Sequence, residues 1–233
     1  MVTKFNGCAL RLTPVDLPAA LHPVAKAAVI IATMLEQRIE QHFIDSADLK
    51  YQAAQVLSRP IAAAVQAMMV CVTSGGKVLA CGNGGSAAAA QHFAAGFLGR
   101  FERERPELAA LALSTDGPTL TAIANEHTFN AIFARQLRAF GSSGDVLLAI
   151  SATGNCVNLL EAIQAAHERE MVVVGLTGQG GGKMAQLLRD TDVHICVPHD
   201  RTARILEVHV LALHCIFDAV DTQLLGEQEE TTP

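Results

Sequence analysis

The stretch "KVLACGNGGSAAAAQHF", residues 77–93, joins a short apolar run to a glycine-rich turn and a helical segment. More apolar, β-rich runs follow, each separated from the next by a helical stretch, at residues 108–114, 145–151, 171–177 and 193–198. Strands that alternate with helices form βαβ units, in which the strands pair in parallel and helices cover both faces. The sequence therefore predicts a doubly wound α/β fold with a five-stranded parallel sheet.

Composition and charge restrict the class of protein. The chain has 233 residues, half of them apolar, and a net charge of -6, so no basic face for direct nucleic-acid binding is expected. Its 6 cysteines show no CxxC pair, which favours buried, reduced thiols and a cytoplasmic location. The apolar run "AKAAVIIATML", residues 25–35, is too short to span a bilayer, so no membrane association is expected.

Three parts are expected along the chain. Residues 1–33 contain three prolines and little periodicity, which predicts an N-terminal extension that is at least partly disordered. Met34 is a potential start residue, and we expect the native protein to begin at or near it. Residues 34–225 form the predicted domain, and the acidic residues 226–233 form a disordered tail.

The segment before the first strand predicts two amphipathic helices, separated near Arg59 and Pro60. Together they have too little sequence to form a core alone. Helices of this kind pack on other helices, and a bundle of them is a common way to build a dimer interface. We therefore expect this pair to pack across a subunit interface.

Two loops are candidates for ligand binding: "GNGGS", residues 82–86, and "SATGN", residues 151–155. Each follows a predicted strand and precedes a helix, which is where open parallel sheets bind ligands. Either loop alone is also explained by tight-turn geometry, but two at equivalent strand ends favour a phosphate site. Neither matches a nucleotide-binding fingerprint, so the implied ligand is a small phosphate ester.

Five segments together carry a resemblance to a known family: "CGNGGSAAAAQHF", "RPELAALALSTD", "GDVLLAISATGN", "VVVGLTGQGGGKMA" and "VPHDRTARILEVHVLALH". They resemble the sugar isomerase (SIS) domain in its phosphoheptose isomerase branch. Within that branch the chain is most similar to the DnaA initiator-associating group, whose members are not enzymes. The resemblance implies a homotetramer with phosphosugar pockets near subunit interfaces. It also implies ligand contacts from Asn83, Ser86, Asp116, Ser151 and Thr153.

The catalytic positions of the isomerases are matched only in part. The resemblance implies two histidines, which correspond to His92 and His214, but the glutamate position is Gly96 and the glutamine position is Leu206. Isomerisation through an enediol needs a positioned acid and base, and glycine supplies neither. No cofactor is firmly implied: the same four positions form the site in zinc-binding members, and two histidines alone would hold zinc weakly.

Three functions are open at this point. Gly96 and Leu206 favour the two non-catalytic functions over the catalytic one. The first is a phosphosugar-binding scaffold, which by resemblance would promote replication initiation by gathering DnaA through multivalency. Leu224 and Leu225 are candidate docking residues for that partner, with subunit packing as the simpler explanation. The alternative is a phosphoheptose isomerase that converts sedoheptulose 7-phosphate to D-glycero-D-manno-heptose 7-phosphate. The third is a regulator that senses a phosphosugar without changing it.

Overall fold

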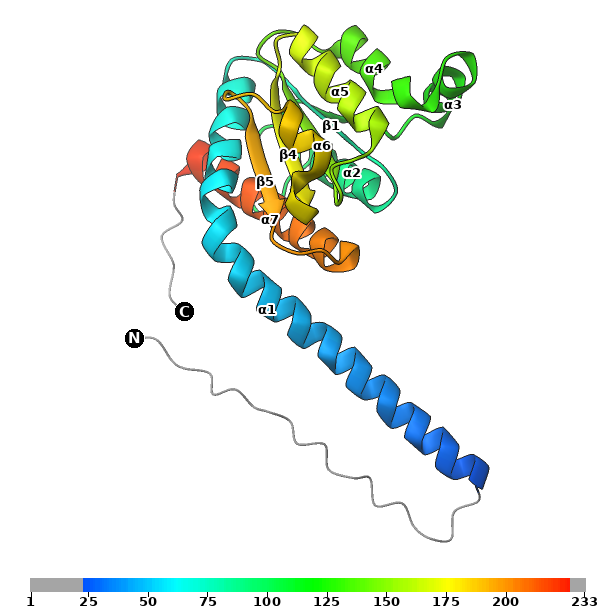
Figure 1. The fold of residues 1–233 in the computed structure, drawn as a ribbon. Coiled ribbons are helices and arrows are strands. Elements are labelled where there is room, and N and C mark those ends of the chain that lie inside the picture. Colours follow the sequence, from blue (N-terminus) through cyan, green and yellow to red (C-terminus); the bar gives the residue numbers. More distant parts are fainter. Residues whose placement is uncertain (1–22, 227–233) are drawn as a thin grey trace. The chain divides into compact units, whose positions relative to one another are not determined.

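The computed structural model describes residues 23–226, with side chains from residue 31 onward. Its centre is a 5-stranded sheet of order β2-β1-β3-β4-β5 in which every neighbouring pair is parallel. Helices cover the sheet (Figure 1). The strands are β1 (Val78–Gly82), β2 (Ala110–Ala112), β3 (Val146–Ser151), β4 (Val172–Gly178) and β5 (Val193–Val197). The predicted doubly wound α/β fold is confirmed.

The helices alternate with the strands along the chain. They are α1 (Pro23–Thr73), α2 (Gly85–Leu98), α3 (Gly117–Glu126), α4 (Ile132–Phe140), α5 (Val157–Glu168), α6 (Gly182–Leu187) and α7 (Thr202–Leu225), with short 3-10 turns at Phe129–Ala131 and Gln179–Gly181. Because β1 lies between β2 and β3, the direction of winding reverses beside it. That reversal leaves a crevice at the carboxyl ends of β1 and β3, the usual ligand position in such sheets.

Two apolar cores hold the sheet and its helices together. Successive strand residues point to opposite faces, so β1 sends Val78 and Ala80 into one core and Leu79 and Cys81 into the other. The first core is completed by α1, α2 and α7, and the second by α4, α5 and α6. The central strands β1, β3 and β4 are buried on both faces, which explains why their sequences lack polar alternation.

α1 is one helix, so the expectation of two helices separated at Arg59 and Pro60 is wrong. Proline removes a backbone donor and usually bends or ends a helix. Here Leu57 and Ala64, on either side of Pro60, are both buried in the same core. Their packing outweighs the hydrogen bond that the helix loses at the proline.

The described part of the chain divides into two compact units between Asp45 and Ser46, and the sheet belongs to the second. Residues 31–73 of α1 are long and apolar enough to cross a membrane by length and composition alone. A core helix of a soluble protein meets the same criterion, and Leu49 and Met68 of this helix are buried in the first core. The predicted extension is described only from Pro23, and the predicted tail only at Gly226.

Five of the predicted reduced cysteines lie within the described residues. All five are free thiols, and Cys71 and Cys81 are buried. The prediction of reduced thiols therefore holds in this part of the chain, but that of burial holds only for two of them, since Cys156 and Cys196 are half-buried and Cys215 is exposed. Cys8 lies outside the described residues.

Candidate active site

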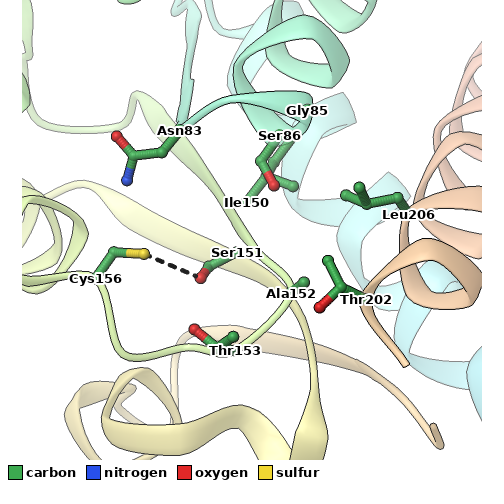
Figure 2. A pocket seen from close by; sticks show the side chains of 10 residues that line it. All are labelled: Asn83, Gly85, Ser86, Ile150, Ser151, Ala152, Thr153, Cys156, Thr202 and Leu206. Carbon is green, nitrogen blue, oxygen red and sulfur yellow. Dashed lines mark hydrogen bonds between the residues drawn. The ribbon is translucent and has the colours of Figure 1, made fainter. Parts of the chain in front are cut away.

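A cavity of about 180 Å³ opens at the carboxyl ends of β1 and β3 (Figure 2). Residues of two loops, between β1 and α2 and between β3 and α5, surround it together with the start of α7. The polar lining consists of Asn83, Ser86, Ser151, Thr153 and Thr202, together with the Cys156 thiol. Gly85, Ile150, Ala152 and Leu206 complete the wall. Four of the five residues predicted to contact a phosphosugar thus lie together.

The loop between β1 and α2 presents the start of a helix to this cavity. Gly84 precedes the helix at a φ of 55°, in a region where a side chain would be strained. No side chain caps α2, and Ser86 in its first turn carries a hydroxyl into the lining. An uncapped helix start beside a hydroxyl is a favourable place for an anion.

The loop between β3 and α5 adds more hydroxyls. The Ser151 hydroxyl accepts a hydrogen bond from the backbone N–H of Gly154 at 3.1 Å and lies 3.7 Å from the Cys156 sulfur. Thr153 accepts one from the backbone N–H of Asn155 at 3.3 Å. These bonds hold the loop in a tight turn, with its two hydroxyl side chains at the cavity.

A second glycine-rich segment, Gly180–Gly182, supports this turn from behind. A Cβ at Gly154 would collide with the carbonyl oxygen of Gly181, and a Cβ at Gly182 with that of Thr153. The backbone N–H of Met184 donates to the Gly154 carbonyl at 2.9 Å. The contact joins loops that are far apart in the sequence, and nothing in either loop alone indicates it.

Asn83 and Asn158 form a reciprocal amide pair beneath the cavity. Each side-chain nitrogen donates to the other side-chain oxygen at 2.9 Å. An amide can donate two hydrogen bonds and accept two, so Asn83 keeps capacity for a ligand. The pair ties the β1 loop to α5 and fixes how Asn83 faces the cavity.

Asp116 is the predicted contact residue that does not line the cavity. It caps α3, and its carboxylate accepts from the Thr119 hydroxyl at 2.6 Å and from the Thr119 backbone N–H at 3.2 Å. These two hydrogen bonds, the hydroxyl first, hold the pKa of Asp116 below its ordinary value. A role for Asp116 in ligand binding stays a prediction.

His92 of α2 and His214 of α7 meet away from the cavity lining. Their Nε2 atoms are 3.0 Å apart, so one nitrogen donates and the other accepts. Burial, and then the nearby His214 ring, lower the pKa of His92 below its ordinary value. The rings of Phe101 and Phe217 pack against His214, with centroids at 5.2 and 6.3 Å. The arrangement places a proton donor and a proton acceptor in direct contact.

A side chain at position 96 would collide with a neighbouring ring in this packing. A Cβ on Gly96 would lie 2.6 Å from the Cζ atom of Phe217, so the phenyl ring fills the space that a glutamate would need. Leu206 is apolar and lies against Gly85. No group of three or more His, Cys, Asp or Glu side chains within residues 31–226 is placed to hold a metal. The residues around His92 and His214 therefore do not fit zinc.

Leu224 and Leu225 end α7 and are partly exposed. Just after them, the Gly226 carbonyl accepts a hydrogen bond from Arg103 at 2.7 Å. This contact fastens the end of the helix to the segment after α2. A docking role for the two leucines stays a prediction.

Comparison with known proteins agrees with this geometry. A family model of the SIS domain matches residues 41–178. The chain is 66% identical to phosphoheptose isomerase from Methylibium petroleiphilum, over 85% of this chain and 99% of that protein. The structure of phosphoheptose isomerase from Neisseria gonorrhoeae superposes with a TM-score of 0.77 at 50% identity, covering 81% of this chain and 99% of that one. For the enzyme from Francisella tularensis the TM-score is 0.78 at 42% identity, with 80% and 97% covered.

These relatives correct the function favoured from the sequence. The expectation of a non-catalytic scaffold was drawn from Gly96 and Leu206, and its link to DnaA from the resemblance to the DnaA initiator-associating group. Relatives matched over 99% of their own length and over 85% and 81% of this chain are named for the enzyme, and this agreement outweighs the two positions. The chain belongs to the SIS domain family, and its relatives there are phosphoheptose isomerases.

Proposed function

We propose that this protein is a phosphoheptose isomerase, which converts sedoheptulose 7-phosphate to D-glycero-D-manno-heptose 7-phosphate. The observation that carries the proposal is the 66% identity to a protein of that name over 99% of its length. The cavity supports it with chemistry suited to a phosphate ester. It combines an uncapped helix start with four hydroxyl side chains, from Ser86, Ser151, Thr153 and Thr202.

The separation of the cavity from the histidine pair suits this substrate. The phosphate is on C7, whereas the reaction takes place at C1 and C2, at the other end of the sugar. Ser86 and His92 are six residues apart on α2, which corresponds to about 9 Å along the helix axis. Leu206 and His214 are eight apart on α7, which corresponds to about 12 Å. A phosphate held at the strand ends would leave C1 and C2 directed along these helices.

The histidine pair supplies both proton functions that the reaction needs. A base removes one proton from C1 of the ketose, and a donor protonates the C2 carbonyl oxygen, which gives the 1,2-enediol. Loss of the proton on the C1 hydroxyl and delivery of a proton to C2 then complete the aldose, with no net change in atoms. When both imidazoles are neutral, the pair keeps one free nitrogen and one N–H that can serve as base and donor. The depressed pKa of His92 favours the neutral form of that ring at neutral pH.

The same proposal includes a cytoplasmic homotetramer. Large apolar side chains are exposed along the first unit, among them Met34, Ile39 and Phe43. Exposed apolar stretches of this length usually contact another protein, and the histidine pair is partly open to solvent in the single chain. A neighbouring subunit would cover both.

The test is turnover of sedoheptulose 7-phosphate by the purified full chain, followed by ¹³C NMR of the sugar carbons. The enzyme from Neisseria gonorrhoeae is the positive control. We expect aldose product from the wild type and a loss of kcat of about 10²–10⁴-fold in His214→Asn, as for removal of a general acid or base.

Ser86→Ala should raise KM, while Ser143→Ala, an exposed site before β3 at the opposite edge of the sheet, should change neither constant. Absence of product from a folded wild type, under conditions in which the control is active, would reject the proposal. Equal kcat in His214→Asn and the wild type would reject the role of the histidine pair.

A further inference from the structure

A buried ion pair joins Asp221, near the end of α7, to Arg105 in the segment that follows α2. Arg105 donates from Nε to Oδ1 of Asp221 at 2.6 Å, and the side chains are 0% and 2% exposed. The second oxygen of Asp221 has no hydrogen-bond partner among the described residues. Arg105 therefore supplies the hydrogen bond that compensates the buried carboxylate.

Arg105 also closes the C-terminal end of α2. Its guanidinium donates to the carbonyl oxygens of Gly96 at 2.6 Å and Phe97 at 2.9 Å. The last carbonyls of a helix lack partners within the helix, and a cation there is favoured by the helix dipole. One side chain thus binds the end of α2 and a carboxylate of α7 at the same time.

This connection lies close to the histidine pair. Gly96 follows His92 by four residues on α2, and Asp221 follows His214 by seven residues on α7, so each is on the same face as its histidine. Phe217 lies between the histidine pair and the contacts of Arg105. Its ring packs against Gly96, and the ring centroids of Phe217 and His92 are 5.6 Å apart. A change in the distance between α2 and α7 near Arg105 should therefore also change the distance between the two imidazole rings.

We propose that Arg105 and Asp221 are positioning residues that set the spacing of α2 and α7 and so keep His92 and His214 in contact. The proposal rests on the isomerase function. Arginine is required because its planar fork reaches a carboxylate and two carbonyls together, whereas an ammonium group is a single point charge. Neither residue touches the cavity, so substrate binding should be unaffected by its replacement.

The test compares Arg105→Lys and Asp221→Asn with Lys77→Met in the full chain. Lys77 forms an ion pair of the same length, 2.6 Å, with Asp145 at the opposite edge of the sheet, which makes it the matched control. We expect kcat to fall at least about tenfold in the first two variants with KM within about twofold, because small displacements of catalytic groups are costly. Lys77→Met should keep both constants.

Ring signals of the histidines in ¹H–¹³C NMR give a second readout. The chemical shifts of the His92 and His214 rings should change in Arg105→Lys and Asp221→Asn and should be unchanged in Lys77→Met. Equal kcat in all three variants, or unmoved histidine signals in folded Arg105→Lys, would overturn the proposal. If the wild type itself shows no turnover, the isomerase function fails, and the histidine signals alone decide whether the pair is positioned by Arg105.

Discussion

Adding one methyl group at Gly96 measures how closely α2 and α7 are packed. The new Cβ would lie 2.6 Å from Cζ of Phe217 and 2.9 Å from each Cε atom, closer than folded proteins tolerate. The Phe217 ring is fully buried and also packs on Phe93 and Phe97, with centroids at 5.8 and 6.0 Å. The ring has little room to move away, so the helices themselves must shift.

The expected magnitude is a balance of two effects. Overpacking of a core costs about 1–3 kcal/mol, while alanine is favoured over glycine in a helix by about 1 kcal/mol. Gly96→Ala should therefore lower the free energy of unfolding by up to about 2 kcal/mol, and should be about 1–3 kcal/mol less stable than a glycine-to-alanine variant at a helical site with room for the methyl group. Phe217→Ala alone should cost about 3–5 kcal/mol, and the double variant less than the sum, because the methyl group enters space that the ring has left.

The assay is urea unfolding followed by circular dichroism at one fixed protein concentration. Gly117→Ala is the matched control, since a Cβ there would meet nothing within 4 Å. A Gly96→Ala variant as stable as Gly117→Ala, or strictly additive effects in the double variant, would refute the close packing of Phe217 on α2. In that case the Phe217 ring would not be what excludes a side chain at position 96.

Three further predictions concern the cavity, zinc and pH. Ser151→Ala should raise KM for sedoheptulose 7-phosphate by about tenfold, the usual effect of one hydrogen bond to a charged group; an unchanged KM in initial-rate measurements would place the phosphate elsewhere. Calorimetric titration of the wild type with zinc should show no stoichiometric binding, because His92 and His214 provide only two ligands. A 1:1 binding isotherm would contradict the conclusion that these residues do not fit zinc. Burial lowers the pKa of His209 from 6.5 to about 4. Between these two pH values the unfolded chain binds a proton at His209 that the folded chain does not bind. The free energy of unfolding should therefore fall by about 3 kcal/mol as the pH drops from above 6.5 to 4. Urea unfolding across this range should show a weaker dependence in His209→Gln, and an equal dependence would assign the effect to other groups.

The sheet could be predicted because each strand is indicated by a pattern within its own short stretch of sequence. Short apolar runs without polar alternation are typical of strands buried on both faces, and here each run is bounded by helical sequence, which separates it from a buried helix. The loops at Ser86 and Ser151 followed from the same pattern, since the carboxyl ends of parallel strands share one edge. Thr202 was missed because it begins the last helix and carries no glycine signal.

The remaining features depend on contacts between distant segments. The sequence around Pro60 indicates a break, and only the packing of Leu57 and Ala64 on the core keeps α1 continuous. The charged run 100–105 is typical of a solvated helix end, yet Arg105 is buried against Asp221. Gly96 pointed to a lost function, although its absent side chain also reflects the position of the Phe217 ring.

The most direct test of the account is the conversion of sedoheptulose 7-phosphate in ²H₂O. If the chain is an isomerase that works through an enediol, D-glycero-D-manno-heptose 7-phosphate should form with deuterium at C2, since a histidine base exchanges its proton with solvent. His214→Asn should slow both product formation and deuterium uptake. No product and no exchange of the C1 hydrogens, while the Neisseria gonorrhoeae enzyme shows both, would contradict the assignment of this chain as a phosphoheptose isomerase.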